Sequence, residues 1–344
     1  MRILERSIAI CRQQPSTVLF PDGEDPRVVR AALRLRREGI AMPLVLGSPR
    51  NLHEILNQVG KRGDALDVVD PTTPELVARN AQDYQAFMAT HGRTISEQEA
   101  ETTVRCPLAA GCLIVRRGEA LAGIAGNISS TPDVMRAGLR FLGTAPDTKT
   151  VSGFFFMISP DGKRCFLFAD VGVIPDPTLE QLADISISSA ACYRHMMQEE
   201  PHVALLSFST KGSATHPRVD RMRQALELVR ARDPQLVVDG ELQFDAAIVP
   251  EVGKSKAPGS TVAGKANVFI FPSLEAGNIA YKITERLGNY MALGPLLQGL
   301  GGGWHDLSRG CNADDVYMVA LIGLALEIER QKGLRAAAGQ KGSP

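Results

Sequence analysis

Short apolar runs alternate with amphipathic segments along much of the chain. Val18 to Phe20 form one such run, which breaks into a Pro/Gly turn. An amphipathic segment over residues 26–38 follows and ends at Gly39, and a second apolar run, AMPLVLG, comes directly after it. Short strands that alternate with helices in this way are typical of an α/β fold.

The alternation resumes after residue 113 and continues towards the C-terminus. VSGFFFMIS and CFLFADVGV flank the turn PDGK, and this pattern predicts a β-hairpin. A last helical pattern begins near Asn312, and the final segment GLRAAAGQKGSP is expected to fray. The other predicted elements are a helix over 2–13, a strand over 120–125, a helix over 132–142, a helix over 177–197 with Pro177 in its first turn, a strand over 202–210 and a helix over 217–232.

The length of 344 residues suggests two domains. We place the boundaries near residues 147 and 298, where the pattern of elements changes. The first domain is then discontinuous and contains residues 1–147 plus 299–344, and the second contains residues 148–298. A chain that returns to its first domain in this way leaves a cleft between the two.

Charge and cysteine usage exclude several classes of protein. Lys and Arg total 38, as do Asp and Glu, so no global basic field exists to hold nucleic acid or an anionic membrane. The six cysteines form no CxxC pair and no zinc-ligand spacing, which favours reduced thiols in the cytoplasm and no metal site. The N-terminus carries charges within its apolar stretch, unlike a signal peptide, and no apolar run is long enough to span a bilayer.

The segment HDLSRGCNADD places several reactive side chains just before the last predicted helix. Asn312 suits an N-cap with Asp315 three residues on, so a simple capped helix is one interpretation. Capping does not explain Ser308, Arg309 and Gly310, which precede the cap. A hydroxyl, a fixed cation and free backbone N–H groups at a helix start are typical of a phosphate or oxyanion site.

Two further strand-to-helix loops are rich in hydroxyl groups. SFSTKGSATHP and AGNISSTPDVMRAGLR could each be an ordinary capped turn, and neither is a Walker A loop. Three such loops in one chain nevertheless predict a cleft that holds a ligand with several phosphates. The candidate residues for contact with this ligand are Ser209, Thr210, Lys211, Gly212, Ser213, Asn127, Ser129, Ser130, Thr131 and Arg136.

A fourth group of polar residues follows later strands. The carboxylates Asp239, Glu241 and Asp245 alternate with apolar residues, so a strand edge is favoured over a metal site. Asn278 lies where a strand gives way to a helix, and we expect it to line the cleft as a substrate-binding residue.

These stretches, in this order, resemble the phosphate acetyltransferase (phosphotransacetylase) family. The motifs that carry the resemblance are LFPDGED, the loop that ends in Arg136, LSFSTKGSA, VDGELQFDAAIVPEV, KAPGSTVAGKANVFIFPSLEAGNIAYK and GPLLQGL with HDLSRGC. They cover nearly the whole chain, and AGNISSTPDVMRAGLR, STKGSATHP and DGELQFDAA look most like the ethanolamine-utilisation branch.

The resemblance implies a two-domain α/β fold like that of the isocitrate and isopropylmalate dehydrogenases, with the active site in the interdomain cleft of a homodimer. The implied reaction converts acetyl-CoA and phosphate reversibly into acetyl phosphate and CoA, so CoA is a substrate and no cofactor is needed. Ser308, Arg309 and Asp315 match the family's catalytic Ser, Arg and Asp, and Arg136 matches a second active-site Arg. Residence in a bacterial microcompartment is a further expectation from the branch.

Two stretches depart from the family pattern. The family commonly carries an Arg in a stretch like LRKHKG, where this chain has AFMATHGRT with Met88 and Ala89 near that position. His91 and Arg93 are the nearby substitutes. The family's usual Ser-Gly-Ala-x-His is here Ala-Gly-Asn-Ile-Ser, which is typical of the branch.

The residues allow two chemical routes. In direct transfer, Arg309 and Arg136 hold the phosphate, Ser308 stabilises the oxyanion and Asp315 accepts the thiol proton of CoA. In covalent catalysis, Cys311 would carry the acetyl group, and we favour direct transfer because no His is adjacent to it. Transfer of propionyl or butyryl groups, and a non-catalytic acyl-CoA-sensing module, stay open as alternatives.

Overall fold

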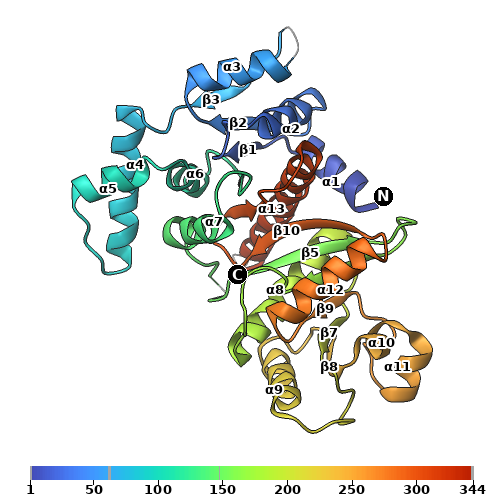
Figure 1. Cartoon of the computed structure of the whole chain (residues 1–344). Coiled ribbons are helices and arrows are strands. Elements are labelled where there is room, and N and C mark those ends of the chain that lie inside the picture. The colour runs from blue at the N-terminus through green and yellow to red at the C-terminus, as the bar shows by residue number, and fades with distance from the viewer. Residues whose placement is uncertain (1, 61–62, 147, 342–344) are drawn as a thin grey trace. The chain divides into compact units, whose positions relative to one another are not determined.

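The computed structural model describes residues 2–60, 63–146 and 148–341, and the chain divides into two compact units (Figure 1). One unit contains Leu4–Ala145 together with the segment from Leu300 onwards. The other contains Pro146–Gly299 together with the first residues of the chain. Each unit has its own β-sheet, so the predicted α/β class is confirmed for both.

The first sheet is parallel throughout, with strand order β11-β4-β1-β2-β3. Its strands are β1 (Thr17–Phe20), β2 (Met42–Leu46), β3 (Asp67–Val69), β4 (Ala122–Ala125) and β11 (Gly303–Asp306). The helices of this unit are α1 (Arg2–Gln13), α2 (Pro26–Arg37), α3 (Pro49–Val59), α4 (Pro74–Thr90), α5 (Glu97–Val104), α6 (Pro107–Arg116), α7 (Thr131–Ala137) with a π-helical turn η1 (Gly138–Leu142), and α13 (Ala313–Lys341).

The second sheet is mixed, with strand order β10-β5-β6-β9-β7-β8. Its strands are β5 (Ser152–Ile158), β6 (Cys165–Ala169), β7 (Val203–Leu206), β8 (Val238–Leu242), β9 (Val268–Ile270) and β10 (Met291–Gln298). The helices of this unit are α8 (Leu179–Met197), α9 (Pro217–Arg232), α10 (Phe244–Ile248), α11 (Pro250–Lys256) and α12 (Leu274–Arg286).

Most predicted elements are confirmed, and two boundaries differ clearly. The hairpin is confirmed, because β5 and β6 pair antiparallel. The helix predicted from residue 177 begins at Leu179 instead, because Thr178 caps it in a reciprocal capping box with Gln181. The tail that was expected to fray over 333–344 continues α13 as far as Lys341, and its last three residues lie outside the described part of the chain.

The packing of β11 beside β4 brings two loops of the first unit unusually close. Trp304 of β11 is buried and donates its indole N–H to Val134 O of α7 at 3.1 Å. A Cβ added at Gly126, which has a φ of +108°, would lie 2.3 Å from Asp306 Oδ1 and 2.5 Å from Leu307 O. Only glycine therefore allows the loop after β4 to approach the end of β11 this closely.

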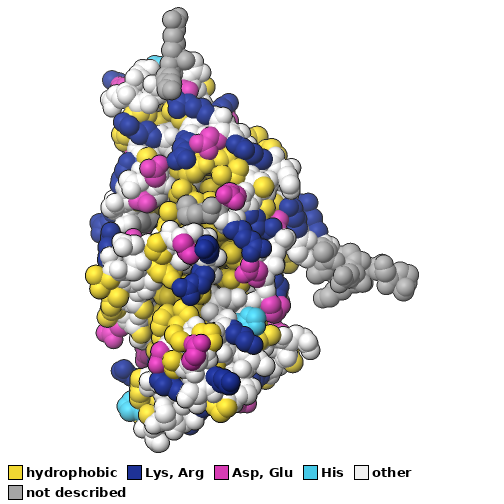
Figure 2. Space-filling model, turned by 90° about the vertical axis from the view of Figure 1, so that its right-hand side faces the viewer, with side chains coloured by type: hydrophobic (Ala, Val, Ile, Leu, Met, Phe, Trp, Pro, Cys, Tyr) yellow, Lys and Arg dark blue, Asp and Glu magenta, His cyan; other side chains and the backbone are white. Residues whose placement is uncertain are grey.

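No helix in the described part of the chain combines the length and the apolar character needed to cross a bilayer. Figure 2 shows one face of the molecule, on which basic and acidic side chains are interspersed with hydrophobic ones. This mixture agrees with the zero formal net charge of the sequence, so positive charge must be concentrated locally to hold an anion.

Candidate active site

Three loops of the first unit meet at one edge of its parallel sheet. They follow β1, β4 and β11, which are neighbours in the strand order. Because these strands are parallel, their carboxyl ends lie on the same edge, where open α/β sheets bind ligands. The loop after β1 contributes Asp22 and Asp25, the loop after β4 contributes residues 126–130, and the loop after β11 contributes residues 307–312.

Asp22 fixes the loop that follows β4. Its Oδ2 accepts hydrogen bonds from the backbone N–H groups of Gly126, Ile128 and Ser129 at 2.9, 3.2 and 2.9 Å. Its Oδ1 accepts the Ser129 hydroxyl at 2.6 Å. The loop's backbone N–H groups could otherwise bind an anion, but here they donate to the buried Asp22 carboxylate. Their hydrogen bonds are therefore already satisfied within the protein.

The predicted ligand residues of this loop also contact the protein itself. Asn127 is 2% exposed and donates its amide to Asp22 O at 3.2 Å and to Asp25 Oδ2 at 3.3 Å. Ser130 caps α7 by accepting the N–H of Asp133, as the capping interpretation predicts. Thr131 donates its hydroxyl to Asp306 Oδ2 at 2.6 Å. Asn127, Ser130 and Thr131 therefore shape the loop, and substrate contact by them stays a prediction.

Arg27 connects all three loops. Its guanidinium donates to Arg309 O at 2.8 Å, Cys311 O at 2.8 Å and Asn127 O at 2.9 Å. It also forms a two-pronged ion pair with Asp25, the N-cap of α2. Arg27 was not predicted from the sequence, because nothing in the motif LFPDGED shows that a residue two positions later reaches a loop some 280 residues away in the chain.

Ser308, Arg309 and Asp315 lie together at the start of α13, and all three are exposed. The Arg309 guanidinium makes no hydrogen bond or ion pair with any residue that the structure describes. The Ser308 hydroxyl accepts the N–H of Gly310 at 3.2 Å and keeps its own proton for a ligand. This segment thus offers an unpaired cation and a hydroxyl donor at a helix N-terminus.

The capping prediction for Asn312 and Asp315 is confirmed. Asn312 Oδ1 accepts the N–H groups of Asp314 and Asp315 at 2.8 and 3.0 Å, and Asp315 Oδ2 accepts the N–H of Asn312 at 2.9 Å. This reciprocal pair uses only one carboxylate oxygen of Asp315. Asp315 is exposed, and its other oxygen accepts no hydrogen bond from a described residue, so capping holds the carboxylate in place without preventing it from accepting a proton.

Asp306 is a buried acid directly behind this segment. It is 2% exposed, and its Oδ1 has no hydrogen-bond partner among the described residues. Burial raises the pKa of Asp306 to about 6, although the hydrogen bonds from Thr131 and the Leu307 N–H act in the opposite direction. The residue ends β11 and was missed in the sequence, where it reads as one more polar residue of HDLSRGC.

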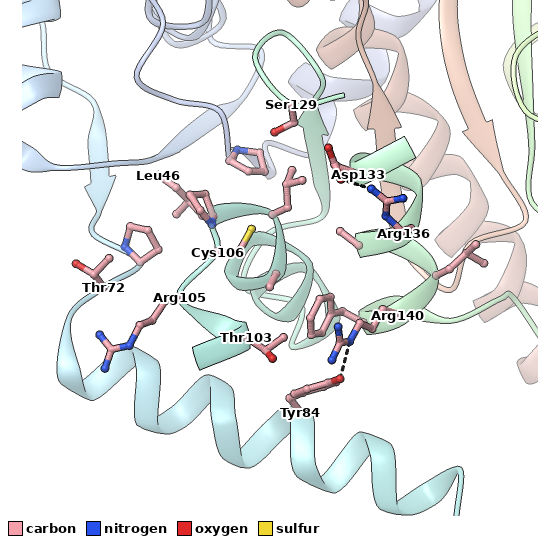
Figure 3. A pocket seen from close by; sticks show the side chains of 18 of the residues that line it. Leu46, Thr72, Tyr84, Thr103, Arg105, Cys106, Ser129, Asp133, Arg136 and Arg140 are labelled. Atoms are coloured by element: carbon pink, nitrogen blue, oxygen red, sulfur yellow. Dashed lines mark hydrogen bonds and ion pairs between the residues drawn. The ribbon is translucent and has the colours of Figure 1, made fainter. Parts of the chain in front are cut away.

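A pocket of about 1980 Å³ opens beside these loops and is lined entirely by the first unit (Figure 3). Arg105 follows α5, Arg136 belongs to α7 and Arg140 to η1, so three separate elements place a guanidinium around it. Ser129 lines the same pocket and links it to the three loops. The volume exceeds the 300–1,000 Å³ or so of most small-molecule sites, which indicates a long ligand rather than acetyl phosphate alone.

The cations of this pocket differ in their availability. The Arg136 side chain is 73% exposed and, among the described residues, pairs with Asp133 alone, and Arg140 donates to Tyr84 Oη at 2.6 Å. The side chains of Arg93 and Arg105 make no hydrogen bond or ion pair with a described residue. Met88, His91 and Arg93 all line the pocket, so the stretch that departs from the family pattern supplies Arg93 to this pocket.

The acids that line the pocket are mostly engaged within the protein. Glu24 accepts the Ser48 N–H at 2.6 Å and the Asn51 amide at 2.7 Å. Asp70 accepts the N–H and the hydroxyl of Thr72 at 2.9 and 2.6 Å. Because these carboxylates already have donors, the unpaired arginines are the groups left to meet an anionic ligand.

Cys311 lies in the loop but is poorly placed as a nucleophile. It is 7% exposed, and its Sγ lies 3.9 Å from Arg27 Nη1. Burial raises the pKa of the Cys311 thiol despite the opposing effect of the Arg27 charge. The thiolate is the nucleophilic form of cysteine, so this environment disfavours the covalent route.

The loop of residues 209–213 belongs to the other unit, and its donors are already bound. Glu241 Oε1 accepts the Ser209 hydroxyl at 2.9 Å and the Gly212 N–H at 2.8 Å, and Arg223 pairs with the same carboxylate. Burial would raise the pKa of Glu241, but the hydrogen bonds from Arg223, Gly212 and Ser209 outweigh it and hold the pKa at about 2. An internal carboxylate therefore fills the cradle that the composition suggested for phosphate.

The remaining predicted residues of that unit are engaged in the same way. Lys211 forms an ion pair with the buried Asp239, and Thr210 Oγ1 accepts the Gln243 N–H at 2.9 Å. Ser213 Oγ accepts the Thr210 N–H at 3.0 Å, and Asn278 donates to Val171 O at 3.2 Å. Asp239 and Glu241 thus act as internal counterions, and substrate contact by residues 209–213 and Asn278 stays a prediction.

Comparison with known proteins gives the family. The family model described as phosphate acetyl/butaryl transferase matches residues 2–324. The chain belongs to this family. A phosphate acetyltransferase from Acetivibrio thermocellus is 40% identical over 326 residues, which cover 94% of this chain and 97% of that protein. The family predicted from the sequence motifs is therefore confirmed, and the chain is an acyltransferase enzyme of the phosphate acetyl/butaryl transferase family.

Solved structures of the phosphate acetyl/butaryl transferase family superpose closely on the chain. A phosphotransacetylase from Streptococcus pyogenes has a TM-score of 0.89 at 38% identity and covers 95% of this chain and 98% of its own. The EutD phosphotransacetylase from Staphylococcus aureus has a TM-score of 0.87 at 36% identity, with 94% and 98% covered. A 4-hydroxythreonine-4-phosphate dehydrogenase from Salmonella typhimurium, at 12% identity and a TM-score of 0.52, shares the fold alone, which agrees with the predicted dehydrogenase-like architecture.

Proposed function

We propose that this chain is a phosphate acetyltransferase that moves an acetyl group reversibly between CoA and inorganic phosphate. The observation that carries the proposal is the combination, within one unit, of an exposed Ser308-Arg309 pair at the start of α13 and a large pocket lined by arginines. Relatives with the name phosphate acetyltransferase, about 40% identical over most of the chain, support the same reaction.

The proposed step is a direct attack. The sulfur of CoA bonds to the carbonyl carbon of acetyl phosphate, the bond from that carbon to the bridging oxygen breaks, and phosphate leaves with the electron pair. The thiol proton passes to the free oxygen of Asp315. Arg309 and Arg136 hold the phosphate, and Ser308 donates to the oxygen that gains negative charge.

The pocket supplies the CoA site in this proposal. Arg93 and Arg105 bind the phosphates of CoA. The length of the CoA molecule explains why the cavity is larger than acetyl phosphate alone needs. Because Arg93 replaces the Arg that the family commonly carries near Met88, CoA affinity depends on this substitute. CoA enters as a substrate, and the step balances without a metal or a cofactor.

The wider assignments follow from the relatives and the sequence. We expect a homodimer in the cytoplasm. We also expect it to bind neither nucleic acid nor a membrane surface, because positive charge is local rather than global. A role in ethanolamine utilisation is supported by the likeness to the EutD phosphotransacetylase, and association with a bacterial microcompartment stays a prediction from the sequence. Sedimentation of the purified protein tests the dimer.

One assay tests the function. Purified protein is incubated with phosphate and acetyl-, propionyl- or butyryl-CoA, and free thiol and acyl phosphate are measured separately. We expect equal amounts of both products, strict phosphate dependence and the fastest turnover with acetyl-CoA. Arg309→Ala should abolish most of this activity, whereas Arg30→Ala, an exposed change on α2, should not. CoA release that is independent of phosphate, or a preference for a longer acyl group, would contradict the proposal.

A further inference from the structure

Arg27 uses every donor that it has to hold the backbone of the candidate active site. A guanidinium carries five N–H groups in a fixed plane. Nε and one Nη2 hydrogen serve Asp25, the other Nη2 hydrogen serves Asn127 O, and the two Nη1 hydrogens serve Arg309 O and Cys311 O. No donor is left for a substrate, so the residue cannot act as a phosphate clamp in this arrangement.

Two of the three carbonyls that Arg27 binds, Arg309 O and Cys311 O, lie on either side of Gly310. The loop around them contains few other constraints, namely the Cys311 N–H to Ser308 O at 2.9 Å and the Gly310 N–H to Ser308 Oγ at 3.2 Å. Fixing the carbonyls of Arg309 and Cys311 fixes the peptide planes between Ser308 and the Asn312 cap. Both side chains are exposed: among the described residues, Ser308 is held only by the Gly310 N–H, and the Arg309 guanidinium makes no hydrogen bond.

Asp25 completes the arrangement. It caps α2 by accepting the Arg27 N–H at 2.8 Å and holds the guanidinium of the same residue. Burial would raise the pKa of Asp25, but Arg27 and Asn127 lower it overall, so the ion pair persists at neutral pH. Lysine cannot replace Arg27, because one ammonium cannot reach three carbonyls and a carboxylate in a plane.

We infer that Arg27 is a positioning residue that sets the conformation of the Ser308–Cys311 loop for acetyl transfer without touching substrate. The inference rests on the proposed function for its kinetic consequence, although its structural consequence is independent of that function. Removing Arg27 should therefore lower turnover more than it weakens CoA binding, and it should loosen the loop around Cys311.

The kinetic test compares Arg27→Gln and Arg27→Lys with the matched control Arg30→Gln on the exposed side of α2. We expect kcat to fall about 100-fold in both Arg27 variants, the scale for a misplaced catalytic group, with the KM for CoA within about threefold of wild type. Added guanidinium chloride at millimolar concentration should restore part of kcat in Arg27→Gly and not in the control. A normal kcat, or a loss confined to the KM for CoA, would overturn the inference.

The structural test needs no activity and so separates failure of this inference from failure of the proposed function. Iodoacetamide labelling is followed by mass spectrometry at Cys311, which is 7% exposed, and at Cys106, which is exposed. In Arg27→Gln we expect Cys311 to be labelled at least tenfold faster and Cys106 at the wild-type rate. Equal labelling of Cys311 in the folded variant and in wild type would overturn the inference even if the wild type transfers acetyl groups as proposed.

Discussion

Two loops of the chain share a composition that is typical of phosphate sites, and the structure separates them. In the 209–213 loop, hydroxyl, N–H and ammonium donors are bound to Glu241 and Asp239. In the Ser308–Cys311 loop, Arg27 holds the backbone carbonyls while the Arg309 guanidinium stays unpaired among the described residues. The comparison teaches that a loop becomes a candidate anion site through the donors it leaves unused, rather than through those it contains.

The largest effect is expected from removing the internal anion of the first of these loops. Glu241 is 1% exposed and pairs with Arg223, so Glu241→Gln leaves a cation without its buried partner. The free energy of unfolding should fall by about 3 kcal/mol, the low end of the range for breaking a buried pair, because the Arg223 side chain is 41% exposed and water screens its charge once it is unpaired. The measurement is urea unfolding of the variant and wild type at pH 7.

The difference in the free energy of unfolding between wild type and Glu241→Gln should also depend on pH, in a definite direction. The pKa of Glu241 is about 2 in the folded protein and near 4.3 in an unfolded chain, so its contribution is complete above about pH 5 and is lost as the pH falls towards 2. The stability gap between wild type and Glu241→Gln should narrow over that range. A gap that stays constant down to pH 2 would show that the carboxylate is not what holds the loop.

Asp315→Asn tests the chemistry beside the Ser308–Cys311 loop. Asn keeps the shape of the Asn312 cap partner but cannot accept a proton, so turnover should fall at least 100-fold, equivalent to about 2.7 kcal/mol in the barrier. The loss should shrink at high pH, where CoA thiolate is already abundant. Steady-state kinetics and a melting curve are the measurements. Near-normal turnover with a lowered melting temperature would mean that Asp315 is only a cap.

Cys311→Ala should have the smallest effect. The thiol is buried and its pKa is raised, so we expect turnover within about tenfold of wild type. Mass spectrometry after addition of acetyl phosphate without CoA should find no acetylated Cys311. A loss of roughly a thousandfold, the scale for removing a covalent nucleophile, together with an acetyl-enzyme, would establish the other route.

Much of the fold was predictable because its signals are local. Val18 to Phe20, the hairpin and the Asn312–Asp315 cap each follow from periodicity or turn chemistry within a few residues. β11 was missed because Gly303–Asp306 contains one large apolar residue and no β-branched one, and it becomes a strand only by pairing with β4. The segment between β2 and β4, which contains α3, β3 and the helices α4, α5 and α6, was also left unassigned.

The sequence supplied candidate residues for the site, whereas the contacts between its loops could not be predicted. Ser308, Arg309 and Arg136 could be selected from loop composition and family resemblance. Arg27, Asp22 and Asp306 could not, because each acts on a loop that is distant in the sequence. The donors of the 209–213 loop are bound by Glu241, which is also distant in the sequence. The pattern of its strand predicted only that Glu241 is a carboxylate at a strand edge.

The most direct test of this difference between the loops is the KM for phosphate in two matched alanine variants, Arg309→Ala and Lys211→Ala, assayed in the direction of acetyl phosphate formation. Loss of a charged hydrogen bond of about 1.5–3 kcal/mol corresponds to about 10- to 100-fold, and we expect Arg309→Ala to raise the KM by that factor while also lowering turnover. Arg309→Lys should restore little, because an ammonium cannot make the two-pronged contact. Lys211→Ala should leave the KM within about threefold of wild type; the reverse pattern, with phosphate affinity lost in Lys211→Ala and kept in Arg309→Ala, would contradict the assignment.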